Sequence, residues 1–321
     1  MRQPHLSRRA LLAGGAAVAV LAGCSTPEPE PVRDTPEEAL ARALIAEKER
    51  TVALYSAPAA GGGKAAAYRD RHAAHLAELR RRYPRLTEPT PASSTVSASA
   101  PVSATPTPTQ KMTLARLRAL DRRAAARRPA QLAGVAPALA QLVASIGACE
   151  ALHAGSAVKR PAAPAARAAA DPGDVAKLRK ALSAEHAAVF AYGLLAARTT
   201  GSLRTRLTRA FDAHRDRRDE LRRLITARGG QPAEPHASYA LPSVPSTGPA
   251  ASRLAAHVEN GLTASYLELV AAVDPALRRY AAVAMQEAVM RAHSFRPSTV
   301  AAFPGLPAPA PAPSPTVTPS G

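Results

Sequence analysis

Residues 174–198 read DVAKLRKALSAEHAAVFAYGLLAAR, and this stretch decides the fold of the C-terminal half of the chain. Its apolar and aromatic side chains recur every three or four residues, which is the spacing of one face of an α-helix. One carboxylate, that of Glu185, falls within the apolar face. The face consists of Val175, Leu178, Leu182, Glu185, Val189, Tyr192 and Ala196. The stretch therefore predicts a long helix that carries an acidic group in its buried stripe.

Three further stripes of this kind follow along the chain. Their ends are marked by Gly229-Gly230, by Asp274-Pro275 and by Pro297. A long connection over residues 229–249 separates the second helix from the third. Four helices with a long crossover in the middle are typical of a ferritin-like bundle rather than a simple up-and-down bundle. We predict this domain over residues 172–303.

The N-terminal half reads as a weaker copy of the same pattern. Leu40, Leu44, Ala46 and Glu47 match Leu178, Leu182, Ala184 and Glu185 at one constant offset, and His72 matches His214. We therefore predict a second, degenerate helical bundle over residues 37–158, in an all-α chain. Residues 86–110 are rich in Ser, Thr and Pro and stand in the place of the crossover, and residues 304–321 alternate Pro with Ala. Both segments are predicted to be disordered.

The first 24 residues have the pattern of an export signal. Arg8 and Arg9 precede an apolar stretch that is too short for a transmembrane helix, as in a twin-arginine signal peptide. Leu21-Ala-Gly-Cys24 resembles the bacterial lipobox, in which the cysteine receives a diacylglycerol. We expect cleavage after residue 23, a Pro-rich tether over residues 24–36, and a lipid-anchored protein on the outer face of the cell membrane.

Composition narrows the classes of partner. The 321 residues include 42 Lys and Arg against 24 Asp and Glu, for a net charge of +18, yet only 3 % are aromatic. Because stacking aromatics are scarce and the chain carries an export signal, we do not expect a nucleic-acid partner. Anionic lipid or an anionic wall polymer fits the charge better. The two cysteines cannot form a disulfide framework, and Cys149 is expected to be a buried apolar residue.

The polar residues in the four C-terminal stripes suggest a metal site. Ferritin-like di-iron centres use Glu on two helices and Glu-x-x-His on the other two. The stripes contribute one candidate ligand each, namely Glu185, His214, Glu259 and Glu287. However, Phe211 lies three residues before His214 and Met290 lies three residues after Glu287, so neither Glu-x-x-His pair is complete. A di-iron centre would lack two of its six side-chain ligands.

A structural network is the competing interpretation of the same residues, and we prefer it. In such a network Glu185 pairs with Arg218 or His214 and tyrosine hydroxyls satisfy the remaining oxygens. Its expected members are Glu185, Tyr192, His214, Arg218, Tyr266 and Tyr280. This reading expects no cofactor, while iron or another transition metal is the alternative. No Gly-rich phosphate loop, nucleophile elbow or zinc cluster is present, so no catalytic residue is predicted.

The N-terminal half offers two weaker signals. Glu150-Ala-Leu-His153 has the Glu-x-x-His spacing, and His72 and His75 lie at helical spacing beside arginines. We expect Glu150 and His153 to lie at a solvated helix end, and His72 and His75 to lie on an exposed basic face.

Four motifs follow one another in the C-terminal half: residues 182–193 (LSAEHAAVFAYG), His214-Arg-Asp-Arg-Arg-Asp-Glu-Leu221, Tyr239-Ala-Leu-Pro242 and Ala256-His-Val-Glu259. Through these motifs, residues 178–296 resemble a family of ferritin-like domains of unknown function in exported proteins of high-GC Gram-positive bacteria. The resemblance implies a four-helix ferritin-like bundle and no particular activity. We expect a non-catalytic binding or structural role at the cell envelope. A metal-binding oxidoreductase or metal-handling protein is the alternative.

Overall fold

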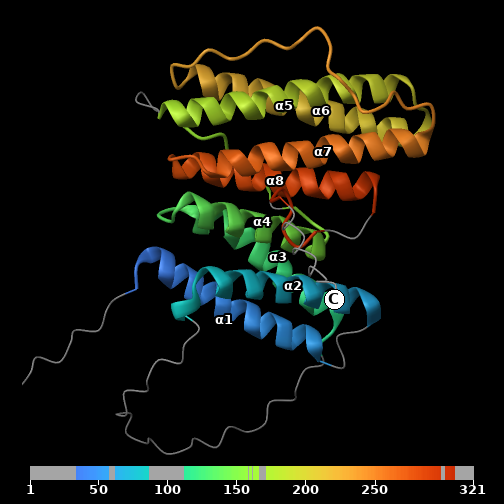
Figure 1. Ribbon diagram of the computed structural model, residues 1–321. Coiled ribbons are helices and arrows are strands. Elements are labelled where there is room, and N and C mark those ends of the chain that lie inside the picture. Colours follow the sequence, from blue (N-terminus) through green and yellow to red (C-terminus); the bar gives the residue numbers. More distant parts are fainter. Residues whose placement is uncertain are drawn as a thin grey trace, which may run out of the picture. The chain divides into compact units, whose positions relative to one another are not determined.

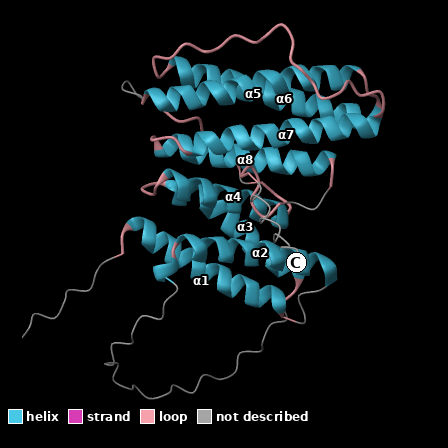
Figure 2. Ribbon diagram, viewed as in Figure 1, coloured by secondary structure: helices cyan, strands magenta, loops and turns pink. Residues whose placement is uncertain are grey.

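The computed structural model describes residues 34–57, 62–86, 112–157, 159–160, 162–165, 171–297 and 301–307. These residues form eight α-helices and two short 3-10 helices, without strands (Figure 2). The all-α prediction is confirmed. The predicted signal with Arg8, Arg9 and Cys24, most of the tether, residues 87–110 of the insert and residues 308–321 of the tail lie outside the described residues. Among the helices that are described, none is apolar enough over sufficient length to cross a membrane.

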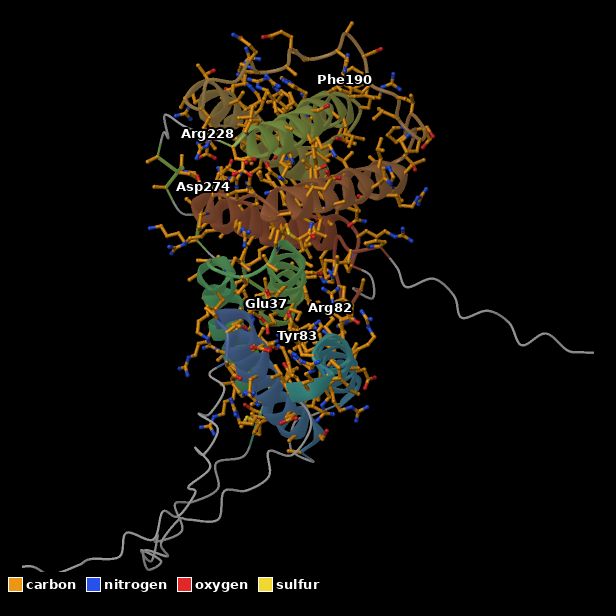
Figure 3. All side chains as sticks on the ribbon, turned by 60° about the vertical axis from the view of Figure 1, so that its left-hand side comes forward. Glu37, Arg82, Tyr83, Phe190, Arg228 and Asp274 are labelled. Atoms are coloured by element: carbon orange, nitrogen blue, oxygen red, sulfur yellow. The ribbon has the colours of Figure 1, made fainter. Side chains whose placement is uncertain are left out.

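The C-terminal bundle consists of α5 (Pro172–Ala197), α6 (Gly201–Thr226), α7 (Gly248–Val270) and α8 (Pro275–Phe295). Helix α5 packs against α6 and α7, and α7 packs against α8 (Figure 1). The long connection between α6 and α7 passes over the outer side of α5 and α6. It is held there by His186, whose Nε2 lies 3.1 Å from the carbonyl oxygen of Ala233, and by the rings of Phe190 (labelled in Figure 3) and Tyr239. The bundle therefore has the predicted order and crossover.

Polar caps set where these helices begin. The carboxylate of Asp171 accepts from the backbone N–H of Asp174 at 3.1 Å, and that of Asp274 accepts from the N–H of Ala276 at 2.9 Å. These bonds satisfy backbone donors that have no partner within the helix. Asp274 also forms an ion pair with Arg228 at 3.0 Å (Figure 3). Asp274-Pro275, predicted as the end of the third helix, therefore also starts the fourth.

The N-terminal half contains α1 (Pro36–Ser56), α2 (Gly62–Arg82), α3 (Leu114–Arg127) and α4 (Pro137–Ala154). Helix α1 pairs with α2, and α3 pairs with α4. The 3-10 turn Arg128–Leu132 connects α3 towards α4, and a second turn, Pro84–Leu86, follows α2. The hydroxyl of Tyr83 donates to the carboxylate of Glu37 at 2.6 Å and ties the end of α2 to the start of α1 (Figure 3).

Helix α4 packs against helices of both the N-terminal and the C-terminal half. Its residues from Leu142 to Ala154 are buried without a break, because α3 covers one side while α7 and α8 cover another. Residues 301–307 also pack here, since Pro304 is buried and its carbonyl accepts from the Ser145 hydroxyl at 2.8 Å. The disordered tail was predicted from residue 304, whereas the packed chain continues to residue 307. Phe303 and Leu306 pack against the core, and Gly305 lies against Thr263 and Leu267 of α7.

The close packing of α4 makes Gly147 a sensitive position. A Cβ at this residue would lie 2.8 Å from the Cβ of Arg128 and 3.4 Å from Nε2 of Gln286. Arg128 is fully buried and cannot move aside freely. We expect Gly147→Ala to lower the free energy of unfolding by roughly 1–3 kcal/mol, measured by urea denaturation.

Gly261→Ala is the matched control for this substitution. Gly261 is exposed in α7, and an added Cβ meets nothing within 4 Å. The gain in helix propensity should raise the free energy of unfolding by up to ~1 kcal/mol. Equal stability of the Gly147→Ala and Gly261→Ala proteins would contradict the packing described for α4.

Candidate functional site

Each bundle holds a cluster of buried polar side chains around one histidine. In the C-terminal bundle the histidine is His214 on α6, and in the N-terminal bundle it is His72 on α2. Both are at most 1 % exposed. Buried polar groups of this kind need partners for every donor and acceptor, so their contacts reveal their protonation states.

His214 lies between two carboxylates. Its Nδ1 is 2.7 Å from Oε2 of Glu185 on α5, and its Nε2 is 3.0 Å from Oε1 of Glu259 on α7. Because both ring nitrogens face acceptors, both carry protons and the ring is an imidazolium. Burial alone lowers the pKa of an imidazole, but the charges of Glu185 and Glu259 outweigh it and raise the pKa of His214 to about 9.

A second cation completes this cluster. Nε of Arg291, on α8, donates to Oε1 of Glu259 at 2.8 Å. The hydroxyl of Tyr192 donates to the same carboxylate at 2.7 Å, and the hydroxyl of Tyr266 donates to Glu185. Two carboxylates thus face two cations supplied by the chain. The side chains that ferritin-like centres would use for metal are here engaged with Arg291 and the imidazolium.

The structure separates some of the predicted C-terminal site residues from this cluster. Glu287 lies apart from Glu185 and pairs with Arg217 and with Arg160, the latter at 3.1 Å. Arg218, predicted to be a network member, instead pairs with Asp219 near the surface. Its neighbour Arg217 is the buried arginine. This correction follows from the helical turn, because adjacent residues on α6 point about 100° apart and only one of them can face the core.

Tyr280 also joins a group next to the central cluster. Its hydroxyl donates to Oε2 of Glu220 at 2.9 Å, and the guanidinium of Arg217 lies 4.8 Å from the centre of its ring. The predicted network therefore divides into two linked parts. Glu185, Tyr192 and Tyr266 lie around the His214 imidazolium and its carboxylates, while Tyr280 contacts Arg217.

The N-terminal cluster overturns two expectations. His72, His75, Glu150 and His153 are all at most 1 % exposed, so they form neither a basic surface nor a solvated helix end. Nε2 of His72 lies 3.2 Å from Oδ1 of Asp121 on α3, and Nδ1 of His153 on α4 lies 3.6 Å from Oδ2. Tyr55 on α1 donates its hydroxyl to the same carboxylate. Helix packing buries these residues, although the sequence around them shows only a polar pattern.

A chain of ion pairs lies directly beside this cluster. The ammonium of Lys48 donates to Glu150, and the guanidinium of Arg128 donates to Glu150 and Glu47. Lys48, Arg128 and Glu150 are at most 1 % exposed. Burial raises the pKa of a carboxyl, but Arg128 and Lys48 outweigh it and hold the pKa of Glu150 at about 2. The two cations and two carboxylates balance one another.

The two central histidines occupy matching positions but differ in charge. Nδ1 of His72 lies 3.4 Å from Nζ of Lys48, which is a donor, while its other nitrogen faces Asp121. One donor and one acceptor fit a neutral imidazole. Burial, assisted by Lys48, lowers the pKa of His72, and burial lowers that of His153 to about 4. Lys48 thus makes the contact with Nδ1 of His72 that Glu185 makes with Nδ1 of His214.

Asp121 is the member of this cluster that sequence reasoning missed. Leu117, Asp121 and Ala124 are buried and follow helical spacing, so the stripe that identified Glu185 was also present here. The thiol of Cys149 is buried as expected, 3.5 Å from Nε2 of His153, and burial raises its pKa to about 12. Among the residues that the structure describes, one group has the spacing of a metal site, and it consists of His72, Asp121 and His153.

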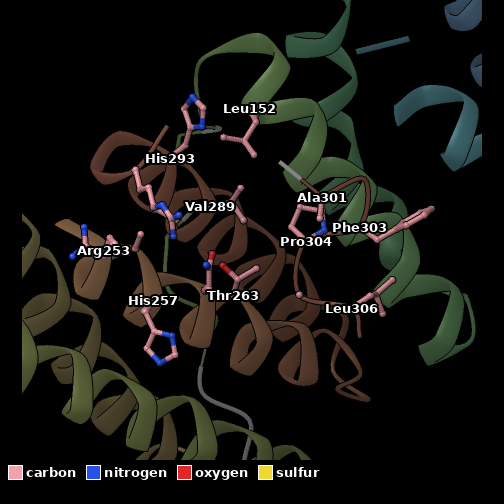
Figure 4. Close-up of a pocket in the computed structure, with 15 residues that line it drawn as sticks. Leu152, Arg253, His257, Thr263, Val289, His293, Ala301, Phe303, Pro304 and Leu306 are labelled. Atoms are coloured by element: carbon pink, nitrogen blue, oxygen red, sulfur yellow. The ribbon is translucent and has the colours of Figure 1, made fainter. Parts of the chain in front are cut away.

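A cavity of about 430 Å³ lies between α7, α8 and the segment 301–306 (Figure 4). Its lining includes Arg253 and His257 from α7, His293 from the end of α8, and Arg296 just beyond it. None of these four side chains has an ion pair or hydrogen bond with another described residue. Among the described residues, no Asp or Glu lines the cavity, so its basic side chains offer donors to any ligand that enters.

The charge state of His214 predicts a pH dependence of stability. Its folded pKa of about 9 exceeds the value of ~6.5 for an unfolded chain, so its contribution is complete below about pH 6.5 and is lost as the pH rises through about 9. The loss is on the order of 3 kcal/mol in the free energy of unfolding. Urea denaturation across this range should show the decline in the native protein and remove it in His214→Gln.

His257→Gln serves as the control, because His257 is exposed in α7 and has no partner in the described chain. This variant should keep the decline between about pH 6.5 and 9. A decline that persists unchanged in His214→Gln would show that other groups cause it.

Comparison with known proteins places the C-terminal bundle in a family. The crystal structure of a conserved hypothetical protein, rv2844, from Mycobacterium tuberculosis is similar to part of this chain, and the two share 30 % sequence identity. The match covers 39 % of this chain and 96 % of that chain, with a TM-score of 0.38. No curated protein matches the chain. Residues 177–308 match the family model described as Domain of unknown function (DUF4439), and this part of the chain is therefore a DUF4439 domain.

Proposed function

We propose that this protein is an exported lipoprotein, held at the outer face of the cell membrane by a diacylglycerol on Cys24, with a non-catalytic binding role. The support for the anchor is the order of Arg8-Arg9, a short apolar stretch and Leu21-Ala-Gly-Cys24. Two acyl chains give stable attachment, whereas one chain gives only marginal attachment. The Pro-rich residues that follow Cys24 would hold the helical part away from the bilayer.

The contacts of the C-terminal cluster support a non-catalytic role. A ferritin-like oxidase needs carboxylates and imidazoles that are free to hold metal. Here Glu185 and Glu259 are engaged with the His214 imidazolium and with Arg291. A metal ion at this place would have to displace both cations. The cluster is better suited to fixing the register of four helices than to redox chemistry.

The observation that carries the binding role is the basic cavity beside α7 and α8. Arg253 and Arg296 lie at its rim without acidic partners, and His257 and His293 add further donors. Arginine binds phosphate oxygens with two parallel hydrogen bonds. We therefore infer a phosphate-bearing ligand, carried either by an anionic lipid headgroup or by an anionic wall polymer. Both sources share the group that the cavity would recognise.

The anchor is tested by fractionation in a bacterium that exports and lipidates proteins. The native chain should sediment with the membrane, and Cys24→Ala should move it to the soluble extracytoplasmic fraction. Cys149→Ala is the matched control, since it removes the other cysteine and should leave the chain in the membrane. Membrane attachment of Cys24→Ala would contradict the anchor.

The binding role is tested with the full chain carrying Cys24→Ser, which excludes attachment through lipid. Binding is measured to vesicles with and without phosphatidylglycerol and to a soluble glycerol-phosphate polymer. Replacing Arg253 and Arg296 by Gln should weaken binding about 30-fold, because each basic residue contributes ~1 kcal/mol near an anionic surface.

The control for this experiment replaces Arg204 and Arg209 by Gln. These residues line a shallow site on α6, and replacing both of them removes the same amount of charge as the cavity double variant. Their loss should change binding little. Equal weakening by the two double variants would indicate diffuse attraction and exclude the cavity. Preference for vesicles or for the polymer then identifies the source of the phosphate.

A further inference from the structure

Three donor groups from three helices of the N-terminal bundle converge on one point. They are Nε2 of His72 on α2, the carboxylate of Asp121 on α3 and Nδ1 of His153 on α4, and one atom of each lies within 4.8 Å of the others. The two ring nitrogens face one another at 3.3 Å. Two imidazoles and one carboxylate form a ligand set that suits zinc and non-haem ferrous iron.

The positions of these donors are set by the packing around them. Tyr68 stacks on the ring of His153 with 4.1 Å between ring centres, and Tyr55 donates to Asp121. All three donor residues are at most 1 % exposed. Donors built on packed helices and supported by a second layer are held in place, as a metal site requires.

The charge of Asp121 has no permanent counter-ion. Its contacts in the described chain are Tyr55, His72 and His153, and no Lys or Arg reaches its carboxylate. The nearby cations Lys48 and Arg128 are matched by Glu47 and Glu150. A buried carboxylate without a cation costs free energy. The C-terminal cluster differs because Arg291 and His214 supply the cations there.

We propose that the N-terminal bundle binds one divalent transition-metal ion, of the Zn²⁺ or Fe²⁺ class, through His72, Asp121 and His153. The ion takes the place at which the two ring nitrogens and the carboxylate meet. This site is separate from the phosphate site proposed above and does not depend on it.

A cavity of about 650 Å³ borders the cluster on the side of His153. Its lining includes Tyr68, Leu152, His153 and Met290, together with the basic residues Lys64, Arg71 and Arg118. Three protein ligands leave positions open for exchangeable ligands such as water.

The outer nitrogens of both rings lie beside cations. Nε2 of His153 lies 3.4 Å from Nη1 of Arg71 and 3.5 Å from Sγ of Cys149, which can accept its proton. Nδ1 of His72 must also carry a proton when Nε2 binds metal, yet it lies 3.4 Å from the ammonium of Lys48. Arg71 and Lys48 therefore both oppose binding, and Lys48 is the one that is fully buried and has no thiol of the described chain beside it. A glutamine at this position could accept from Nδ1 through its oxygen and still donate to Glu150.

The test uses the full chain carrying Cys24→Ser, stripped with EDTA, dialysed against Zn²⁺ and analysed for bound metal. We expect one equivalent of zinc per chain and a rise in the thermal midpoint on zinc addition. Asp121→Asn, which preserves the side-chain volume, should weaken zinc binding at least tenfold. Glu259→Gln is the matched control, since it removes a buried carboxylate from the other bundle and should retain the zinc.

Lys48→Gln supplies a test that does not require the loss of a ligand. It should bind zinc more tightly than the native chain while circular dichroism shows the same helix content. The proposal is overturned if the folded native chain binds no zinc, if Asp121→Asn retains native affinity, or if Lys48→Gln binds zinc no better. If Asp121→Asn does not fold, zinc binding by the native chain and by Lys48→Gln decides the question.

Discussion

The imidazolium of His214 between Glu185 and Glu259 is the interaction on which the C-terminal bundle depends. It joins α6 to α5 and α7 at once, and Arg291 joins α8 to the same carboxylate. A one-residue rotation of any of these helices would leave a buried charge without a partner, at a cost of several kcal/mol. Alanine-rich helices slide past one another easily, because their apolar faces are smooth. The charged cluster therefore selects one register where hydrophobic packing alone would allow several.

The N-terminal bundle also holds a buried polar cluster around one histidine, but its charges are arranged differently. Lys48 contacts Nδ1 of His72, as Glu185 contacts Nδ1 of His214, so His72 is neutral and the positive charge lies on α1. Glu150 then balances Lys48, and Arg128 balances Glu47. Asp121 faces two imidazoles, whereas Glu259 faces Arg291 and an imidazolium. These differences separate a cluster that supplies its own cations from one that has room for a cation.

Helix α4 links the two bundles within one core. It is buried on nearly all sides because α3, α7, α8 and residues 301–307 cover it. Such a helix must be apolar or paired throughout. Its one carboxylate, Glu150, is paired with Lys48 and Arg128, and the helix consists mainly of Ala, Leu, Val and Ile. The basic cavity borders this helix at Leu152 (Figure 4), and its basic lining residues Arg253, His257, His293 and Arg296 are exposed. The buried helix α4 and the basic cavity are therefore neighbours.

The sequence alone was sufficient to predict an all-α chain, the four C-terminal helices and their long crossover, because helical periodicity and Gly or Pro breaks are local properties. It also singled out Glu185, His214 and Glu259, since an acid in an apolar stripe is visible without a structure. Sequence could not decide that Arg217 rather than Arg218 is buried, or that His72, Asp121 and His153 meet. Those outcomes depend on the rotation of each helix and on neighbours more than thirty residues away, which only tertiary packing sets.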